Sequence, residues 1–271
     1  MPTPAPAWLD ELSLKPGPPW LGMGVHPLAV PAWLLPDGDS QRDRQWKTDL
    51  LEQRPASVFG ARDTAAVRVA SQEVLDLIMA ATGSSPAPDG LHPLDAAGRL
   101  VQEDLCLMVE RDGAFHLDAA SLCFPAYWQL EEKLGLPLAA VHALVPYYGE
   151  ELSDKVDTFL QRLRPERPMW RRNWAIHDNP SYFLPTPTPP YARRAPDGLY
   201  LRSERQTLRR LTRAEVVLFT IRTQQVPLAV VAERPELAHA LAEAIDAWPP
   251  ELVAYRGTHG ARAACGWLAT R

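Results

Sequence analysis

Residues 199–223, LYLRSERQTLRRLTRAEVVLFTIRT, constrain the fold more than any other stretch of the chain. They open as a strand in which Arg202 and Glu204 share one face, because successive strand side chains alternate. Residues 205–211 predict a short basic turn, and residues 216–223 predict a second, apolar strand. The stretch therefore brings charged groups close to two apolar strands. This costs desolvation free energy unless an anionic or hydrogen-bonding group lies nearby.

The other elements concentrate strands in the middle of the chain and helices at its two ends. Periodicity predicts helices at 41–53, 66–81, 126–134, 150–163 and 235–248. Strands are predicted at 105–110, 114–117, 137–146, 168–176 and 226–231, the first two as a hairpin. This distribution predicts an α+β fold with helices packed against a mostly antiparallel sheet. Residues 1–21 are proline-rich and predict an extended arm, which leaves residues 22–271 as a single domain.

The composition limits the function classes. The chain has 271 residues, 46% hydrophobic and 23% charged, which is ordinary for a globular protein with a substantial core. Its formal net charge of −5 argues against general nucleic-acid binding. No run approaches the roughly 18 apolar residues of a membrane span, and the N-terminus lacks a secretory signal pattern. We therefore expect a cytoplasmic protein with neither nucleic acid nor membrane as a partner.

The cysteines and glycines exclude built-in electron-transfer motifs. The three cysteines (Cys106, Cys123 and Cys265) lie far apart and form no C-x-x-C pair. They cannot supply the four thiolates of an ordinary iron–sulfur cluster or a cysteine-rich zinc site. Gly22 and Gly24 begin a G-x-G, but no dinucleotide-binding fingerprint or P-loop follows. If the chain is a redox enzyme, its electrons come from another protein.

Several longer motifs stand in a recognisable order. They are GMGVHPL from residue 22, FPAYWQLEEKLGLPL at 124–138, PLAAVHALVP, WRRNWAIHD, and LRSERQTLRRL followed by VLFTIRT. In this order and spacing they resemble the haem-dependent oxidative N-demethylase family, the haem-bearing subunit of dimethylamine-type monooxygenases. The resemblance covers residues 22–228. The chain departs from the family pattern at Thr212, where a proline is usual, and at Gln224, where an aromatic residue is common, so the resemblance does not define the substrate.

The resemblance implies a PAS-like α+β fold around a b-type haem. It also implies oxidation of a small methylated amine with O2, with formaldehyde as a product. Electrons would come from a partner flavin and iron–sulfur protein, which agrees with the absence of those motifs here.

A haem needs an axial ligand, and the chain has seven histidines. We expect His142 to be the ligand, because it is the single polar residue in AAVHALV and lies in a family motif. His177, beside Asn173 and Trp174, is the second choice. The structural alternative for His142 is a buried neutral imidazole bonded to the backbone.

The other site predictions follow from side-chain chemistry. Arg202, Arg205 and Arg209 suit haem propionates, because a guanidinium fork matches a carboxylate. The alternative is a solvated edge of surface salt bridges whose arginine stems cover apolar surface. Glu204 is a candidate to hold an alkylammonium substrate and relay protons, although it could instead pair with Arg202; Asp178 is its rival. We expect Asn173 and Trp174 to line the pocket, although a tryptophan at a strand end is more often part of a core.

Two other functions remain open from the sequence. A PAS-like haem or small-ligand sensor would keep the haem slot but show no oxidative turnover. A cofactor-free interaction protein would use its arginines to bind an acidic partner. Oligomeric state is not predicted.

Overall fold

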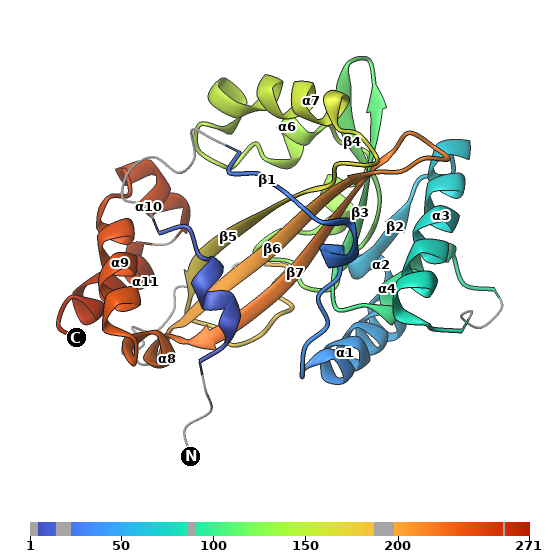
Figure 1. The fold of residues 1–271 in the computed structure, drawn as a ribbon. Coiled ribbons are helices and arrows are strands. Elements are labelled where there is room, and N and C mark those ends of the chain that lie inside the picture. Colours follow the sequence, from blue (N-terminus) through green and yellow to red (C-terminus); the bar gives the residue numbers. More distant parts are fainter. Residues whose placement is uncertain (1–4, 15–22, 86–89, 187–197, 257) are drawn as a thin grey trace.

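The structure is a computed structural model, and it describes residues 5–14, 23–85, 90–186, 198–256 and 258–271. Seven strands form one antiparallel sheet with the order β1-β5-β6-β7-β3-β4-β2 (Figure 1). Their bounds, in that order, are His26–Pro27, Met169–His177, Tyr200–Arg210, Val217–Pro227, Asp104–Arg111, Ala114–Ser121 and Phe59–Ala61. Helices precede and follow the main strands, so the α+β prediction is confirmed. The narrower PAS-like assignment stays a prediction, as does the division into an arm and one domain.

The helices form three groups around the sheet (Figure 1). The first group contains α1 (Ser40–Gln53), α2 (Pro55–Val58), α3 (Ala65–Thr82) and α4 (Pro93–Leu100). The second contains α5 (Leu130–Lys133), α6 (Leu138–Val141), the π-helical turn η4 (Tyr148–Leu152) and α7 (Ser153–Arg162). The third contains α8 (Leu228–Ala232), α9 (Pro235–Asp246), α10 (Pro250–Arg256) and α11 (Thr258–Leu268). The short turns η1 (Ala7–Glu11) and η3 (Val30–Trp33) complete the described elements.

The long strands β5, β6 and β7 present two faces with different coverings. Facing residues of antiparallel neighbours point to the same side, so the register assigns each residue to a face. We call the face that carries Arg172, Arg205 and Thr207 the first face, and the face that carries Arg171 and Glu204 the second face. Apolar residues of α3, α4, α9 and α11 pack on the first face, and those of α5, α6 and α7 pack on the second.

The predicted basic turn at 205–211 is wrong, because β6 runs unbroken to Arg210. Both faces of this part of the strand are packed, so its alternating side chains find partners in the extended conformation. Leu208 packs in the core against α7, Arg209 stacks on Trp33 and Arg210 donates to the carbonyl of Leu163. These contacts replace the solvated turn that the run of arginines suggested.

Two predicted strands are helical. Pro137 begins the short helix α6, so the predicted strand at 137–146 is wrong. Pro227 ends β7 and precedes α8, because proline has no N–H with which to continue a ladder; the predicted strand at 226–231 is therefore wrong beyond this point. The predicted helix at 126–134 shortens to α5, since Tyr127 adopts a left-handed φ of 61°. The helices α4, α10 and α11 were missed.

The other predictions agree with the structure within a few residues. They concern the hairpin of β3 and β4, the strands β5 and β7, and the helices α1, α3, α7 and α9. None of the helices in the described part of the chain combines the length and apolarity that crossing a bilayer requires.

Candidate functional site

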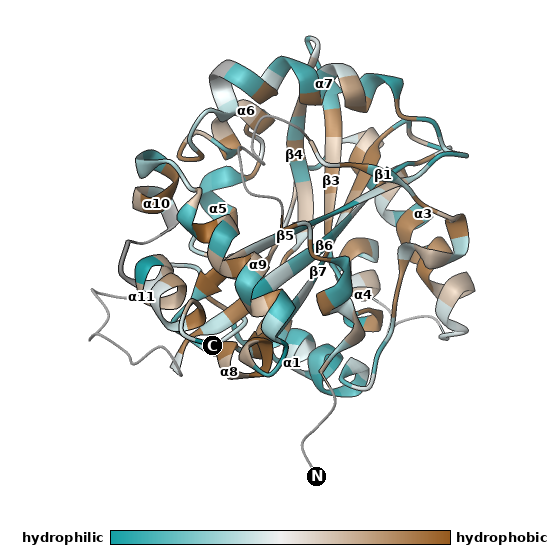
Figure 2. Cartoon of the chain, turned by 60° about the vertical axis from the view of Figure 1, so that its left-hand side comes forward, coloured by the Kyte–Doolittle hydropathy of each residue, from teal (hydrophilic) through white to brown (hydrophobic). Residues whose placement is uncertain are grey.

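The second face carries a row of polar side chains inside the molecule. Arg171 faces Gln206, Glu204 lies between Asn173 and Thr223, and Arg202 lies opposite Gln225 in the ladders of β5, β6 and β7. Figure 2 colours long stretches of these strands as hydrophilic although helices surround them. An interior polar row of this kind needs hydrogen-bond partners, because unpaired buried groups are costly.

Four atoms in this row are fully buried and have no hydrogen-bond partner among the described residues. They are Arg171 Nε, Arg202 Nε, Thr223 Oγ1 and Gln225 Oε1. All four lie on the same face of three adjacent strands. Such a concentration of unused donors and acceptors is typical of a place where water or a ligand binds.

Glu204 lies in the middle of the row and is the main negative charge near two arginines. It accepts a hydrogen bond from Gln206 Nε2 at 3.0 Å. Burial lowers the pKa of Arg171 and of Arg202, and in each case the carboxylate of Glu204 is the largest opposing influence. Glu204 is therefore shared as the main counter-charge between two guanidinium groups.

His142 lies immediately after α6, near one end of this row. Its Nδ1 is 2.9 Å from the carbonyl oxygen of Leu138. A carbonyl only accepts, so Nδ1 carries the hydrogen and the neutral ring keeps its lone pair on Nε2. Desolvation by burial lowers the His142 pKa and the charge of Arg171 lowers it further, although the Leu138 bond opposes them. His142 is therefore held neutral, with the tautomer that a metal-ligating histidine needs.

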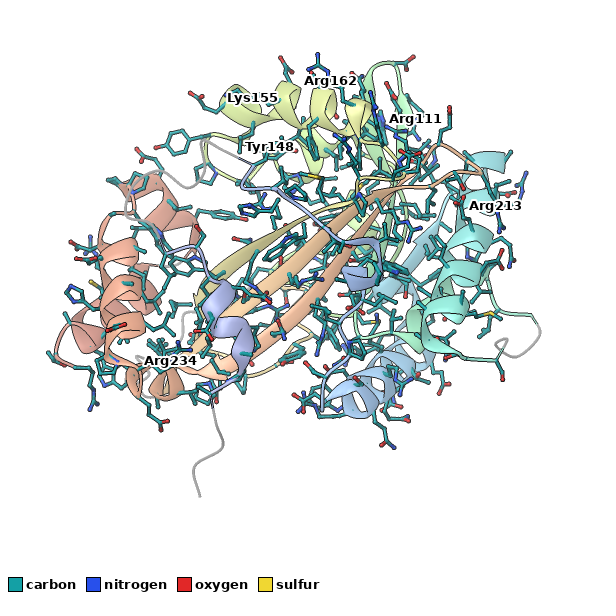
Figure 3. The ribbon with its side chains drawn as sticks, viewed as in Figure 1. Arg111, Tyr148, Lys155, Arg162, Arg213 and Arg234 are labelled. Atoms are coloured by element: carbon teal, nitrogen blue, oxygen red, sulfur yellow. The ribbon has the colours of Figure 1, made fainter. Side chains whose placement is uncertain are left out.

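Tyr148 completes this end of the row. Its ring stacks on His142 with centroids 4.3 Å apart and an angle of 16° between the planes. Tyr148 is buried on the sheet side of α7 (Figure 3). Burial raises the pKa of its hydroxyl group, the charge of Asp157 adds to the rise, and the charge of Arg171 opposes it. His142, Tyr148 and Arg171 thus form one cluster.

His177 lies at the other end of the row. It is six residues from Arg171 along β5, which corresponds to roughly 20 Å at the rise of an extended strand. It is 5% exposed and stacks on Tyr127, with centroids 5.1 Å apart. Asp178 follows it directly and is half-buried. The two candidate histidines therefore serve opposite ends of the face.

Arg202 already has a structural task. It is 1% exposed and donates through Nη1 to the carbonyl of Tyr182 at 3.1 Å and through Nη2 to that of Phe124 at 2.6 Å. These bonds attach two loop segments to the middle of the sheet. Of its three nitrogens, Nε is the one without a hydrogen-bond partner among the described residues.

Three of the predicted site residues lie on the first face, so the sheet separates them from Glu204. Trp174 stacks on Trp248 at 5.3 Å in the core beneath the C-terminal helices. Arg205 donates to the carbonyl of Ala32 at 2.8 Å, and Arg209 lies over the ring of Trp33. The structure therefore groups Asn173, Arg202 and Glu204 with the histidines.

The sequence analysis missed Arg171, Tyr148 and Tyr127. Strand alternation at 168–176 was sufficient to place Arg171 on the same side as Asn173, and thus away from Arg172 and Trp174. Nothing in the sequence indicated that the two tyrosines stack on the two histidines.

A site built from several metal-ligating side chains does not occur in the described residues, where no three His, Cys, Asp or Glu side chains gather. The second face instead offers a single histidine lone pair, buried cations and an apolar wall. This donor set suits a haem, which supplies four iron ligands itself and needs one axial ligand and partners for its carboxylates.

Comparison with protein families gives one match to the chain. The model of haem-dependent oxidative N-demethylase, alpha subunit-like proteins matches residues 80–265, which is more than half of the chain. The matched region contains β3 to β7 and thus the whole polar row of the second face. It confirms the family predicted from the sequence motifs. The chain belongs to the family of proteins that resemble the alpha subunit of haem-dependent oxidative N-demethylase.

Proposed function

We propose that this chain binds haem b and catalyses the O2-dependent oxidative N-demethylation of a small methylated amine, releasing formaldehyde. The observation that carries the proposal is the family match over residues 80–265. Electrons would come from a partner flavin or iron–sulfur protein, because the sequence contains no motif for either cofactor. Haem would supply the activation of O2 and the oxidising power.

His142 is the proposed axial ligand. Its Nδ1–H bond to Leu138 leaves Nε2 as the electron donor, and stacking on Tyr148 fixes the plane of the ring. His177 is the less favoured choice. The arginine at its end of the row is Arg202, and this side chain already donates hydrogen bonds to two backbone carbonyls.

Glu204 is the proposed substrate and proton-transfer residue. An alkylammonium ion beside its carboxylate would be held by charge, and the same group could transfer protons to the reacting oxygen and from the amine. Asn173 faces Glu204 across the ladder and would orient the amine by hydrogen bonding. Asp178, beyond the end of β5, is the alternative proton carrier.

The haem-slot prediction for Arg205, Arg209 and Trp174 is not retained in this proposal. Their side chains lie on the first face, where they contact Ala32, Trp33 and Trp248. We propose a structural role for them, in joining the N-terminal turns and the C-terminal helices to the sheet.

The experiment is a turnover assay of the haem-loaded chain with a reductase and NAD(P)H. Dimethylamine is the first substrate, and formaldehyde is measured against O2 consumed. Formaldehyde formation that requires the amine, haem and O2 together supports the proposal. Binding of O2 or CO without formaldehyde contradicts it and indicates the sensor function, and a colourless protein that rejects haem contradicts both.

A further inference from the structure

Arg171 differs in its hydrogen bonding from three neighbouring arginines of β5 and β6. Arg172, Arg202 and Arg205 each donate to carboxylate, amide or backbone oxygens. Arg171 makes no hydrogen bond and no ion pair with any described residue, and its Nε is fully buried. Arg171 as a whole is partly exposed, but a buried guanidinium N–H without an acceptor is costly, and a ligand or water that reached it would remove that cost.

The nearby charges do not supply that partner. Glu204 is the largest favourable charge acting on Arg171, but it is shared with Arg202 and accepts its hydrogen bond from Gln206. His142 Nδ1 is already bonded to the carbonyl of Leu138, and the ring of Tyr148 stacks on His142, so neither side chain brings a carboxylate to Arg171. An anion from outside the chain would supply the missing acceptor.

The surroundings define the anion further. Arg171 follows Met169 by two residues on the same face of β5, and Met169, its ladder partner Leu208 and Val141 belong to the apolar cluster that covers this face. A ligand here must therefore present a carboxylate to the guanidinium and an apolar body to the wall. A ligand that also carried a metal could use the Nε2 lone pair of His142 in the same cluster.

We propose that Arg171 binds a propionate of the haem and is its principal carboxylate anchor in this chain. This inference rests on the proposed function. A guanidinium–carboxylate pair would satisfy the unused Nε, and it would leave Glu204 available for the amine. It replaces Arg205 and Arg209, the anchors that the sequence suggested.

The test combines a variant with a modified ligand. The full-length chain is titrated with haem and with haem dimethyl ester, in which both propionates are esterified. The proteins are wild type, Arg171→Met, Arg171→Lys and the first-face control Arg209→Met. Affinity is measured from the Soret band and from haem transfer to an acceptor globin, so that catalytic turnover is not needed.

We expect esterification to weaken binding to wild type by about tenfold or more, as loss of a charge-assisted pair requires. Arg171→Met should bind haem about as weakly as wild type binds the ester, with no further loss on esterification. Arg209→Met should lose as much affinity on esterification of haem as wild type does. Arg171→Lys should show part of that loss.

Two results overturn the inference. If haem binds but Arg171→Met shows the same ester penalty as wild type, the propionate is bound elsewhere, and the proposed function stands. If wild type itself does not bind haem, the inference and the proposed function both fail. If Arg171→Met does not fold, Arg171→Lys is used instead. The assignment is refuted if this variant binds haem as tightly as wild type and loses as much affinity as wild type when the propionates are esterified.

Discussion

Lys47 and Asp104 form a buried ion pair that holds the loop before α5 against the sheet. Lys47 is 0% exposed and Asp104 is 1% exposed, with Nζ 3.4 Å from Oδ1. Lys47 also donates to the carbonyl of Glu103. Asp104 accepts hydrogen bonds at 2.9 Å from the backbone N–H groups of Cys123 and Phe124, and the carbonyl of Phe124 accepts from Arg202. The pair is thus connected to the second face.

Lys47→Met tests this connection. The substitution keeps an apolar stem of similar length but leaves the carboxylate of Asp104 buried without its cation. Breaking one side of a buried pair costs about 3–5 kcal/mol. The two backbone donors to Asp104 remain, so we expect about 3 kcal/mol, the lower end of that range.

Urea denaturation of the haem-free chain measures this loss. Lys47→Met should lower the unfolding free energy by about 3 kcal/mol. The double variant Lys47→Met/Asp104→Asn should lose less unfolding free energy than the two single variants lose together. Asp49→Ala, a change at a partly exposed position on the same helix, is the control and should fall within about 0.5 kcal/mol of wild type. A loss below about 1 kcal/mol for Lys47→Met, or strictly additive losses, would refute the reasoning.

Three further predictions concern the second face. His142→Ala should change the Soret and CO-difference spectra, and added imidazole should restore these spectra in part. His177→Ala should leave the spectra unchanged. The reverse pattern would make His177 the ligand. The unfolding free energy should decrease as pH falls below about 6.5, because burial lowers the folded-state pKa of His142 and the unfolded chain binds the proton first. His142→Gln should flatten this dependence, and an equal slope in the variant would contradict it. Glu204→Gln should retain haem but reduce kcat/KM for the amine by about 10²–10⁴-fold, as loss of a general acid–base group does, and near-normal turnover would favour Asp178.

The sequence predicted the fold class because hydrophobic periodicity is a local property. The hairpin of β3 and β4 is bounded by a clear Asp112–Gly113 turn, and α3 has an unbroken apolar stripe. The basic run at 205–211 failed for a tertiary reason. Arg209 and Arg210 are stabilised by Trp33 and by carbonyls of the α7 region, which are remote in sequence.

The candidate site was predicted in part. Alternation correctly placed Arg202 and Glu204 on one face of β6, and the prediction of His142 as ligand stays a prediction. Arg205 and Arg209 were grouped with Arg202 by residue type, although their odd spacing from Arg202 places them on the opposite face. That grouping depended on the turn, since a continuous strand separates odd and even positions.

The importance of Arg171 could not be predicted from composition or motif. Arg171 combines three properties: it lies on the second face, its buried Nε has no hydrogen-bond partner among the described residues, and its charge acts on His142. This combination appears only in the folded chain. The neutral state of His142 likewise depends on the Leu138 carbonyl and on burial beneath α7. Both appear only when α6, α7 and β5 have packed together.

The absorption spectrum of the full-length chain titrated with haem tests the central claim most directly. We predict binding of one haem per chain with a sharp Soret band, which shifts when dithionite and CO are added and which is altered in His142→Ala. A broad spectrum typical of unbound haem, or a wild-type spectrum that His142→Ala reproduces without change, would contradict the proposal that the second face holds haem through His142.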